Sequence, residues 1–197
     1  MKTTTTPSVE TRKPSWPDVL LVCFLAISLA GNVIQGWKVK SLMSLVPSSK
    51  AHTGMLLSKL NARTVSGSVQ QLSFGQGKTV ILYFFKPKCR WCATNIENIR
   101  SFSRQRSGDL RFIGIATTGE DLPASLEKLP LPFPIYVIDD PSELRQVDFL
   151  GTPQTVEIAP SGKVVNNWVG AFQPSTAAAI EKRFAIHLPG LVPGEGK

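Results

Sequence analysis

The chain of 197 residues is predicted to form an α/β fold, with a mixed central sheet flanked by helices, preceded by one apolar N-terminal helix. Uncharged runs rich in β-branched and aromatic residues alternate with helical stretches, which is typical of a largely parallel sheet with right-handed crossovers. A closing pair of strands, separated by a tight turn, adds antiparallel pairing. No charged residue occurs from Val19 to Trp37, so this segment is distinct from the domain.

Length and composition narrow the class of protein. The chain has room for one ordinary domain with a short appendage, and its three cysteines cannot form a disulfide framework. Apolar residues at 42% and charged residues at 18% exclude both a disordered chain and a polytopic membrane protein. The net charge of +8 permits attraction to anionic surfaces, but no nucleic-acid-binding module accompanies it, so no nucleic-acid partner is expected.

The first 60 residues divide into three segments. Residues 1–18 are polar and contain three prolines, which predicts a disordered tail. The run of 19–37 would rise about 28 Å as a helix, close to the hydrocarbon thickness of roughly 30 Å, and predicts a transmembrane or signal-anchor helix. Residues 38–60 carry few strong periodic signals and are predicted to be a linker.

Two other interpretations of the apolar run stay open. Ser28 and Ala30 have the size and spacing of a signal-peptide cleavage site, which would remove the segment. A short apolar helix can also be buried in a core. Three cationic residues stand on each side of the run, so the distribution of charge does not decide its orientation.

The domain is predicted over residues 61–187, with strands where apolar runs stand between turn signals. The strongest is 79–85, Thr-Val-Ile-Leu-Tyr-Phe-Phe, which carries no charge and predicts a strand buried on both faces. Pro-Ser-Gly-Lys at 160–163 predicts a tight turn that joins the last two strands into a hairpin. The predicted strands span 69–74, 79–85, 111–116, 135–138, 155–159 and 164–168.

Four helices are predicted between and after these strands, at 89–106, 120–128, 141–149 and 175–184. The first places Ile96, Ile99 and Phe102 on one face. The third has proline near its first turn, and Ser175 is the expected N-cap of the last. The residues that follow, 188–197, are predicted to form a flexible tail.

Two cysteines, Cys89 and Cys92, stand directly after the most buried strand, where a helix begins. The unpaired N–H groups and the dipole of a helix N-terminus favour a thiolate at Cys89. The nearby cations Lys86, Lys88 and Arg90 are expected to lower its pKa further. Cys92 lies on nearly the same face, so it can attack a mixed disulfide formed by Cys89. The sequence therefore predicts a reactive Cys89 and a more buried, resolving Cys92.

A Cys-x-x-Cys pair can also bind zinc, attach a haem or form a structural disulfide. A zinc site needs two further ligands, and the third cysteine and the two histidines are isolated in the sequence. Ala93 follows the pair where attachment of a c-type haem requires His. A purely structural disulfide would close too short a loop to add much stability. We therefore expect no metal and no dissociable cofactor, and the redox group is predicted to be the disulfide Cys89–Cys92.

Pro153, just before the strand at 155–159, is a second signal. A proline at this position is best explained by an irregular, cis bond with Thr152 that ends one segment and starts the next. An ordinary turn before the strand is the plainer alternative. Trp91, between the cysteines, either contacts a substrate or packs against this loop.

Together, the two signals resemble the thioredoxin superfamily, and most closely its membrane-anchored TlpA/ResA-like members. The resemblance covers about residues 66–185 and rests on GKTVILYFFKPKCRWC, FIGIA and LGTPQTVEIAPSGKVVNNWVG. It implies a thioredoxin-like fold in which a cis-proline loop faces the cysteines. Thr152 and Pro153 match that loop and are expected to align the substrate chain, and Arg90 and Trp91 are the further candidates for substrate contact.

The resemblance also implies an activity and a location. It indicates a thiol–disulfide oxidoreductase that reduces client proteins and is held in the inner membrane by one helix, with its domain in the periplasm or another extracytoplasmic space. Such a reductase implies a transmembrane protein that donates electrons. The expected partners are therefore the clients, the donor and the membrane itself.

The sequence departs from the family pattern around the cysteines. Lys88 stands where a Trp usually precedes the first cysteine, and no proline precedes Cys92. Tyr83 occupies a strand position that is often acidic in cytosolic thioredoxins. These positions bear on the reduction potential and therefore on the direction of electron flow.

A function of another class stands beside this one. A thioredoxin-like domain can also serve as a non-catalytic assembly factor or as a metallochaperone. The lack of a histidine near the cysteines weighs against metal delivery.

Overall fold

The computed structural model describes residues 16–44, 53–128 and 130–192. The chain forms two compact units, Met1–Ser48 and Ser49–Lys197. The first contains one helix, α1 (Trp16–Ser44). Predicted segments that fall on residues 1–15, 45–52 and 193–197 lie outside the described residues.

Helix α1 begins inside the predicted tail and ends inside the predicted linker. Pro17 is accommodated because the first turn of a helix has no partner for its N–H groups. Apolar side chains such as Leu21, Phe24 and Leu29 are exposed along α1. Among the helices of the described residues, none is both long enough and apolar enough to cross a membrane.

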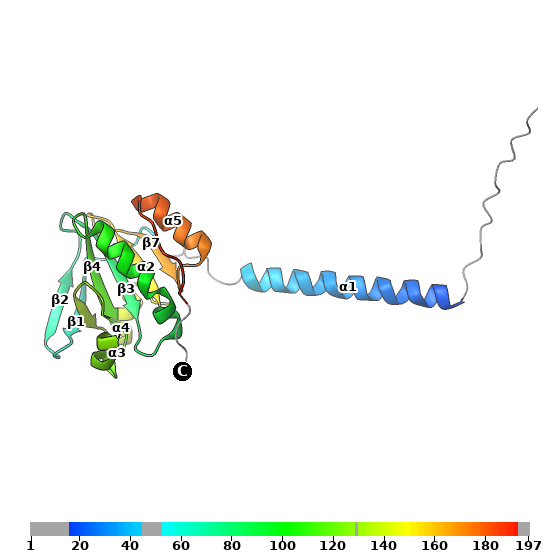
Figure 1. Ribbon diagram of the computed structural model, residues 1–197, viewed down its shortest axis with the longest axis horizontal. Coiled ribbons are helices and arrows are strands. Elements are labelled where there is room, and N and C mark those ends of the chain that lie inside the picture. Colours follow the sequence, from blue (N-terminus) through cyan, green and yellow to red (C-terminus); the bar gives the residue numbers. More distant parts are fainter. Residues whose placement is uncertain (1–15, 45–52, 129, 193–197) are drawn as a thin grey trace, which may run out of the picture. The chain divides into compact units, whose positions relative to one another are not determined.

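The second unit is built on a seven-stranded mixed sheet in the order β2-β1-β5-β4-β3-β6-β7 (Figure 1). Strand β3 pairs with β4 in parallel and with β6 antiparallel, so it lies inside the sheet. This confirms the predicted mixed sheet flanked by helices. The strands are β1 (Lys59–Thr64), β2 (Val69–Ser73), β3 (Thr79–Phe85), β4 (Leu110–Ala116), β5 (Ile135–Val137), β6 (Gln154–Ile158) and β7 (Val164–Val169).

Four helices accompany the sheet: α2 (Arg90–Arg106), α3 (Leu122–Lys128), α4 (Pro141–Gln146) and α5 (Pro174–Phe184). Helices α2 and α5 cover one face, where Ile99, Phe102 and Phe184 pack against the sheet. A second core on the other face includes Leu144 of α4. Alternate residues of β3 enter the two cores, which confirms that this strand is buried on both faces.

Strand β1 is missing from the predicted elements. Its sequence, KLNART, has only Leu60 and Ala62 as apolar residues, and these two point inward while their neighbours are exposed. The strand is held by tertiary contacts instead. The buried carboxylate of Glu143, from α4, accepts hydrogen bonds from the backbone N–H of Asn61 at 2.9 Å and from its side-chain amide at 2.8 Å.

Several predicted helix and tail boundaries are wrong, including that of α3, which begins at Leu122 and not at residue 120. Helix α4 ends at Gln146, not at residue 149. The N-cap of α5 is Gln173, not Ser175, because Pro174 favours the first helical position and the helix starts there. The predicted tail from 188 is partly ordered, since Leu188 is buried and the N–H of Gly190 donates to Asn98 of α2 at 3.0 Å.

An ion pair joins α5 to β6. The guanidinium of Arg183 donates two hydrogen bonds of 2.6 Å to the carboxylate of Glu157, which is buried. The amide of Asn166 on β7 donates to the same carboxylate at 2.6 Å. Because a buried carboxylate needs such partners, this cluster sets the position of α5 over the end of the sheet.

Candidate active site

Cys89 occupies the junction between β3 and α2, where it is the N-cap residue of the helix. Its backbone is extended, with φ −80° and ψ 111°, and its Sγ accepts a hydrogen bond from the backbone N–H of Cys92 at 3.2 Å. The sulfur thus takes the place of the oxygen of a usual N-cap side chain. The same N–H group and the helix dipole favour negative charge on this sulfur when it is reduced.

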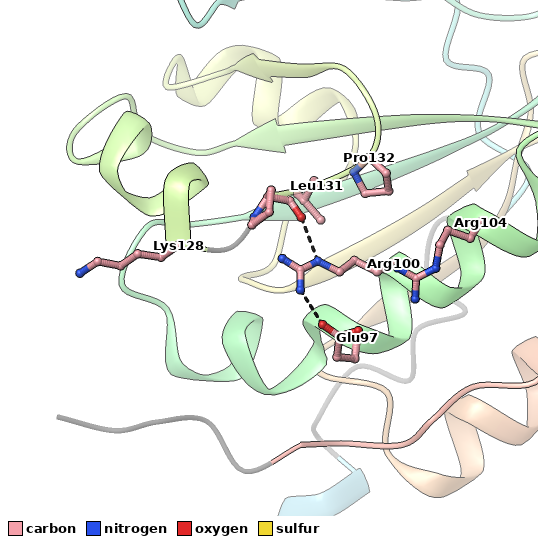
Figure 2. Close-up of a pocket in the computed structure, with 7 residues that line it drawn as sticks. Glu97, Arg100, Arg104, Lys128, Leu131 and Pro132 are labelled. Atoms are coloured by element: carbon pink, nitrogen blue, oxygen red, sulfur yellow. Dashed lines mark hydrogen bonds and ion pairs between the residues drawn. The ribbon is translucent and has the colours of Figure 1, made fainter.

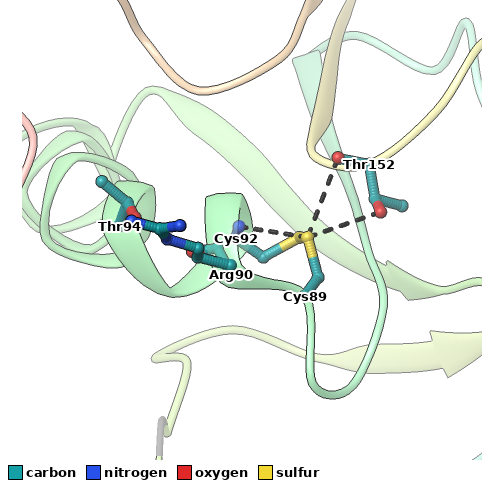
Figure 3. Close-up of a disulfide and its surroundings, with 5 residues drawn as sticks. All are labelled: Cys89, Arg90, Cys92, Thr94 and Thr152. Carbon is teal, nitrogen blue, oxygen red and sulfur yellow. Dashed lines mark hydrogen bonds between the residues drawn. A yellow bond between two sulfur atoms is a disulfide. The ribbon is translucent and has the colours of Figure 1, made fainter. Parts of the chain in front are cut away.

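Cys89 and Cys92 are joined in a disulfide (Figure 3), and the two residues differ in exposure. Cys89 is partly exposed, whereas the exposed fraction of Cys92 is 6%. An incoming thiolate can therefore reach the sulfur of Cys89, while that of Cys92 is shielded. This asymmetry is what the predicted roles of nucleophile and resolving cysteine require.

The loop before β6 faces the disulfide. Its Thr152–Pro153 peptide bond is cis, as the sequence predicted. The hydroxyl of Thr152 donates to Cys89 Sγ at 3.6 Å, and the carbonyl oxygen of Thr152 lies 3.7 Å from the same sulfur (Figure 3). The structure thus brings Thr152, which is 63 residues from Cys89 in the chain, together with the cysteines.

Gln154 holds this loop in place. Its buried amide nitrogen donates to the carbonyl of Asp148 at 3.1 Å and to Asn167 Oδ1 at 2.9 Å, and its oxygen accepts from the N–H of Leu150 at 2.8 Å. Sequence reasoning missed this residue, because nothing in the sequence distinguishes a buried glutamine at the start of a strand from an exposed one.

Unlike Thr152 of the cis-proline loop, none of the three cations expected to act on Cys89 donates a hydrogen bond to its sulfur. Lys88 Nζ is 2.5 Å from a carboxylate oxygen of Asp121, and the hydrogen bond and charge of Asp121 raise the pKa of Lys88. The side chain of Arg90 extends away from the disulfide (Figure 3), and Lys86 is exposed. The groups that contact Cys89 Sγ are therefore neutral donors, the N–H of Cys92 and the hydroxyl of Thr152. Nothing in the sequence indicated the pairing of Asp121 with Lys88.

Trp91 is exposed, with 55% of its surface accessible. It stands in the first turn of α2, next to the disulfide in the chain, so its indole is available to a partner. Leu150, at the start of the cis-proline loop, is also half exposed. Trp91 thus adds an exposed apolar side chain to the turn that carries the disulfide.

A separate pocket lies further along α2 (Figure 2). Arg100 crosses it, donating to the carbonyl of Pro130 at 2.8 Å and pairing with Glu97 at 2.5 Å. Neither cysteine lines the pocket, and Arg100 lies about 12 Å beyond Cys92 along the helix axis. Within the part of the chain that the structure describes, no group of three or more His, Cys, Asp or Glu side chains is placed to hold a metal ion.

Solved structures share this fold. A protein described as a candidate thiol:disulfide interchange protein DsbE from Chlorobium tepidum is 20% identical, with a TM-score of 0.59, over 68% of this chain and 95% of its own. The thioredoxin domain of a thiol-disulfide oxidoreductase from Bacteroides vulgatus is 19% identical, with a TM-score of 0.56, over 68% and 99%. A secreted disulfide oxidoreductase of Mycobacterium tuberculosis, described as homologous to DsbE of E. coli, is 21% identical, with a TM-score of 0.52, over 63% and 95%.

These likenesses show that the second unit has a thioredoxin-like fold, as the sequence predicted. The sequence matches no protein-family model and no curated protein.

Replacement of Thr152 by Val should raise the pKa of the Cys89 thiol by about half a unit to one unit, because it removes a donor to the thiolate. The pKa is measured from the pH dependence of alkylation in a chain that carries Cys92→Ala and Cys23→Ser. Thr94→Val is the matched control, since that hydroxyl donates to the carbonyl of Arg90 and not to sulfur. Equal pKa values in the Thr152 variant and the control would contradict the assigned contact.

Proposed function

We propose that this chain is a membrane-tethered, extracytoplasmic thiol–disulfide oxidoreductase that reduces disulfides of client proteins. The observation that carries the proposal is the partly exposed sulfur of Cys89, bonded to buried Cys92 at the N-terminus of α2 and faced by the Thr152–Pro153 loop. Structures of the same fold described as thiol:disulfide interchange proteins and oxidoreductases support it.

The proposed reaction is two successive thiol–disulfide exchanges. The thiolate of Cys89 attacks one sulfur of a client disulfide; a Cys89–client S–S bond forms, and the second client sulfur leaves as a thiolate. The thiolate of Cys92 then attacks Cys89 Sγ, which forms the Cys89–Cys92 disulfide and releases the first client sulfur. The two protons of the enzyme dithiol end, through solvent, on the client thiols, and the client gains two electrons.

The cis-proline loop would align the client chain. The carbonyl oxygen of Thr152 lies beside the reactive sulfur, where a backbone N–H of an extended client segment can donate to it. Trp91 and Leu150 would contact apolar side chains next to the client cysteine. Arg90, which points away from the disulfide, would contact only the periphery of a bound client.

The proposed tether is the N-terminal apolar segment. Its support is the charge-free run from Val19 to Trp37, together with the apolar side chains that the described part of α1 exposes. The extracytoplasmic location follows from the family resemblance and is in keeping with the secreted oxidoreductase among the solved structures. A reductase in that location requires a transmembrane electron donor, which regenerates the dithiol by exchange at Cys89.

A Cys92→Ala variant should accumulate client proteins as mixed disulfides with Cys89, because the resolving thiolate is missing. The adducts are detected as bands that a reductant removes from a non-reducing gel. Cys89→Ala is the matched control and should trap nothing. If no client is trapped while Cys89 still reacts with an alkylating agent, the oxidoreductase proposal fails. A second experiment uses a Cys89→Ser, Cys92→Ser double variant in cells. Activity retained by that variant would favour an assembly factor.

The reduction potential of the Cys89–Cys92 pair should lie near or below about −250 mV, in the range of reductases. It is measured by equilibrating the full chain, with Cys23→Ser, against thiol buffers of known potential. A value near about −120 mV would reverse the proposed direction and make the protein an oxidant of its clients.

The full chain should stay with the membrane fraction after an alkaline carbonate wash. Leu21→Lys with Leu25→Lys should release it, since each central charge costs about 2.5–3.5 kcal/mol in a membrane-spanning helix. Val69→Lys, at an exposed position on β2, is the control and should leave the distribution unchanged. Release of the unaltered chain, or a mature protein whose mass shows loss of the segment, would contradict the tether.

A further inference from the structure

Three polar side chains in the core between the sheet and α2 are buried with one atom each that has no hydrogen-bond partner among the described residues of the protein. The atoms are Tyr83 Oη, Asn95 Nδ2 and Thr155 Oγ1. At most 1% of each residue is exposed. Native proteins leave few buried polar groups unpaired, because the lost hydration is not replaced. Three such atoms in one region therefore call for a physical reason.

The three side chains meet between the sheet and α2. Tyr83 of β3 stands directly opposite Thr155 of β6 in the antiparallel register, so their side chains are on the same face. Tyr83 belongs to the core that this face forms with α2, and Asn95 is on the buried side of α2. The amide of Asn95 is close enough to the phenol of Tyr83 to act on its ionisation, although the two do not form a hydrogen bond of standard geometry.

Cys92 shares the buried face of α2 with Asn95 and the core cluster with Tyr83. Cys92 and Asn95 are three residues apart on α2 and are both buried, so they share one face of the helix. Cys92 also belongs to the same core as Tyr83. The orientation of the Asn95 amide is set, because its oxygen already accepts from the N–H of Phe172 at 3.0 Å and from Asn98 at 3.1 Å. The amide nitrogen of Asn95 is therefore the atom directed toward Tyr83.

The hydroxyl of Tyr83 is a permanent donor. Burial raises the pKa of Tyr83, by more than the amide of Asn95 lowers it, so the phenol keeps its proton at any physiological pH. In the disulfide state, which the structure shows, the sulfur of Cys92 is neutral and accepts hydrogen bonds weakly. In the reduced state the same sulfur can carry a negative charge, and charged acceptors form the stronger hydrogen bonds.

We propose that Tyr83 and Asn95, with Thr155 beside them, form a donor site that stabilises the thiolate of Cys92, directly or through one bridging water. These donors have no acceptor among the described residues while the disulfide is closed, and the Cys92 thiolate becomes their acceptor when the disulfide opens. This inference rests on the proposed function, because only a resolving or leaving Cys92 has to bear that charge. It assigns Tyr83 to the second exchange, in which Cys92 attacks Cys89 Sγ.

Other charges around Cys92 do not supply this stabilisation. From the cysteine loop, Lys88 is paired with Asp121, which follows β4, and Lys86 is exposed. From β6, Glu157 shares the face of Thr155 but is held by Arg183 of α5. The side chain of Arg90 on α2 extends away from the disulfide. The neutral donors are therefore the groups left to act on a Cys92 thiolate among these elements.

The test is the pKa of Cys92 in the full chain with Cys23→Ser and Cys89→Ser, followed by thiolate absorbance near 240 nm. Tyr83→Phe should raise this pKa by about one unit, because one hydrogen bond to a charged acceptor is lost. In the chain with both active-site cysteines, resolution of a preformed mixed disulfide at neutral pH should slow about threefold, since the loss of thiolate is partly offset by greater nucleophilicity. Tyr136→Phe is the matched control, because Tyr136 is the only other tyrosine and packs in the opposite core.

An unchanged pKa of Cys92 in a folded Tyr83→Phe chain would overturn the proposal. Should that variant not fold, incorporation of 3-fluorotyrosine at both tyrosines gives a second test: a stronger phenol donor must lower the pKa of Cys92, and no change overturns the proposal. Neither titration needs a client. A chain in which Tyr83→Phe shifts the pKa but Cys92→Ala traps nothing would therefore refute the oxidoreductase function and leave the donor site standing.

Discussion

The antiparallel pairing of β3 with β6 is the constraint on which the candidate site depends. It places Phe84 opposite Gln154, so that Thr152, two residues earlier, lies beyond the end of β3 where α2 begins. The same pairing sets Tyr83 against Thr155 on the side of the sheet that α2 covers. The register of this one strand pair thus places Thr152 at Cys89, and it places Tyr83 and Thr155 together on the face that α2 covers.

The electrostatics of the site are built from neutral groups. Cys89 Sγ is contacted by a backbone N–H and a threonine hydroxyl, while the lysine next to it in sequence is paired with Asp121. Donors fixed by the fold need little reorganisation to stabilise a charge that develops on sulfur. A flexible exposed lysine would lose side-chain entropy if it stabilised the same charge. The buried phenol and amide below the disulfide extend this arrangement to the second sulfur.

Much of the fold could be predicted because its signals are local. The run at 79–85 has no charge and becomes β3, which lies inside the sheet, and the turn at 160–163 joins β6 to β7. Strand β1 could not be predicted, since Leu60 and Ala62 are its only apolar residues and its Asn61 donates to Glu143, 82 residues further along the chain. Helix α5 begins one residue earlier than Ser175 indicates, because proline favours the first helical position and Pro174 occupies it.

The disulfide pair, its place at the start of a helix and the cis bond at Pro153 could be predicted from the sequence, because spacing and backbone chemistry are local properties. The groups that contact the sulfurs depend on tertiary packing. Proximity in sequence suggested Lys86, Lys88 and Arg90, and the family resemblance suggested Thr152. Gln154, which holds the loop of Thr152, and Asn95, which is buried on α2, reach their positions through sheet register and helix packing. Those contacts join residues far apart in the chain or depend on which face of an element is buried, and no spacing along the sequence records them.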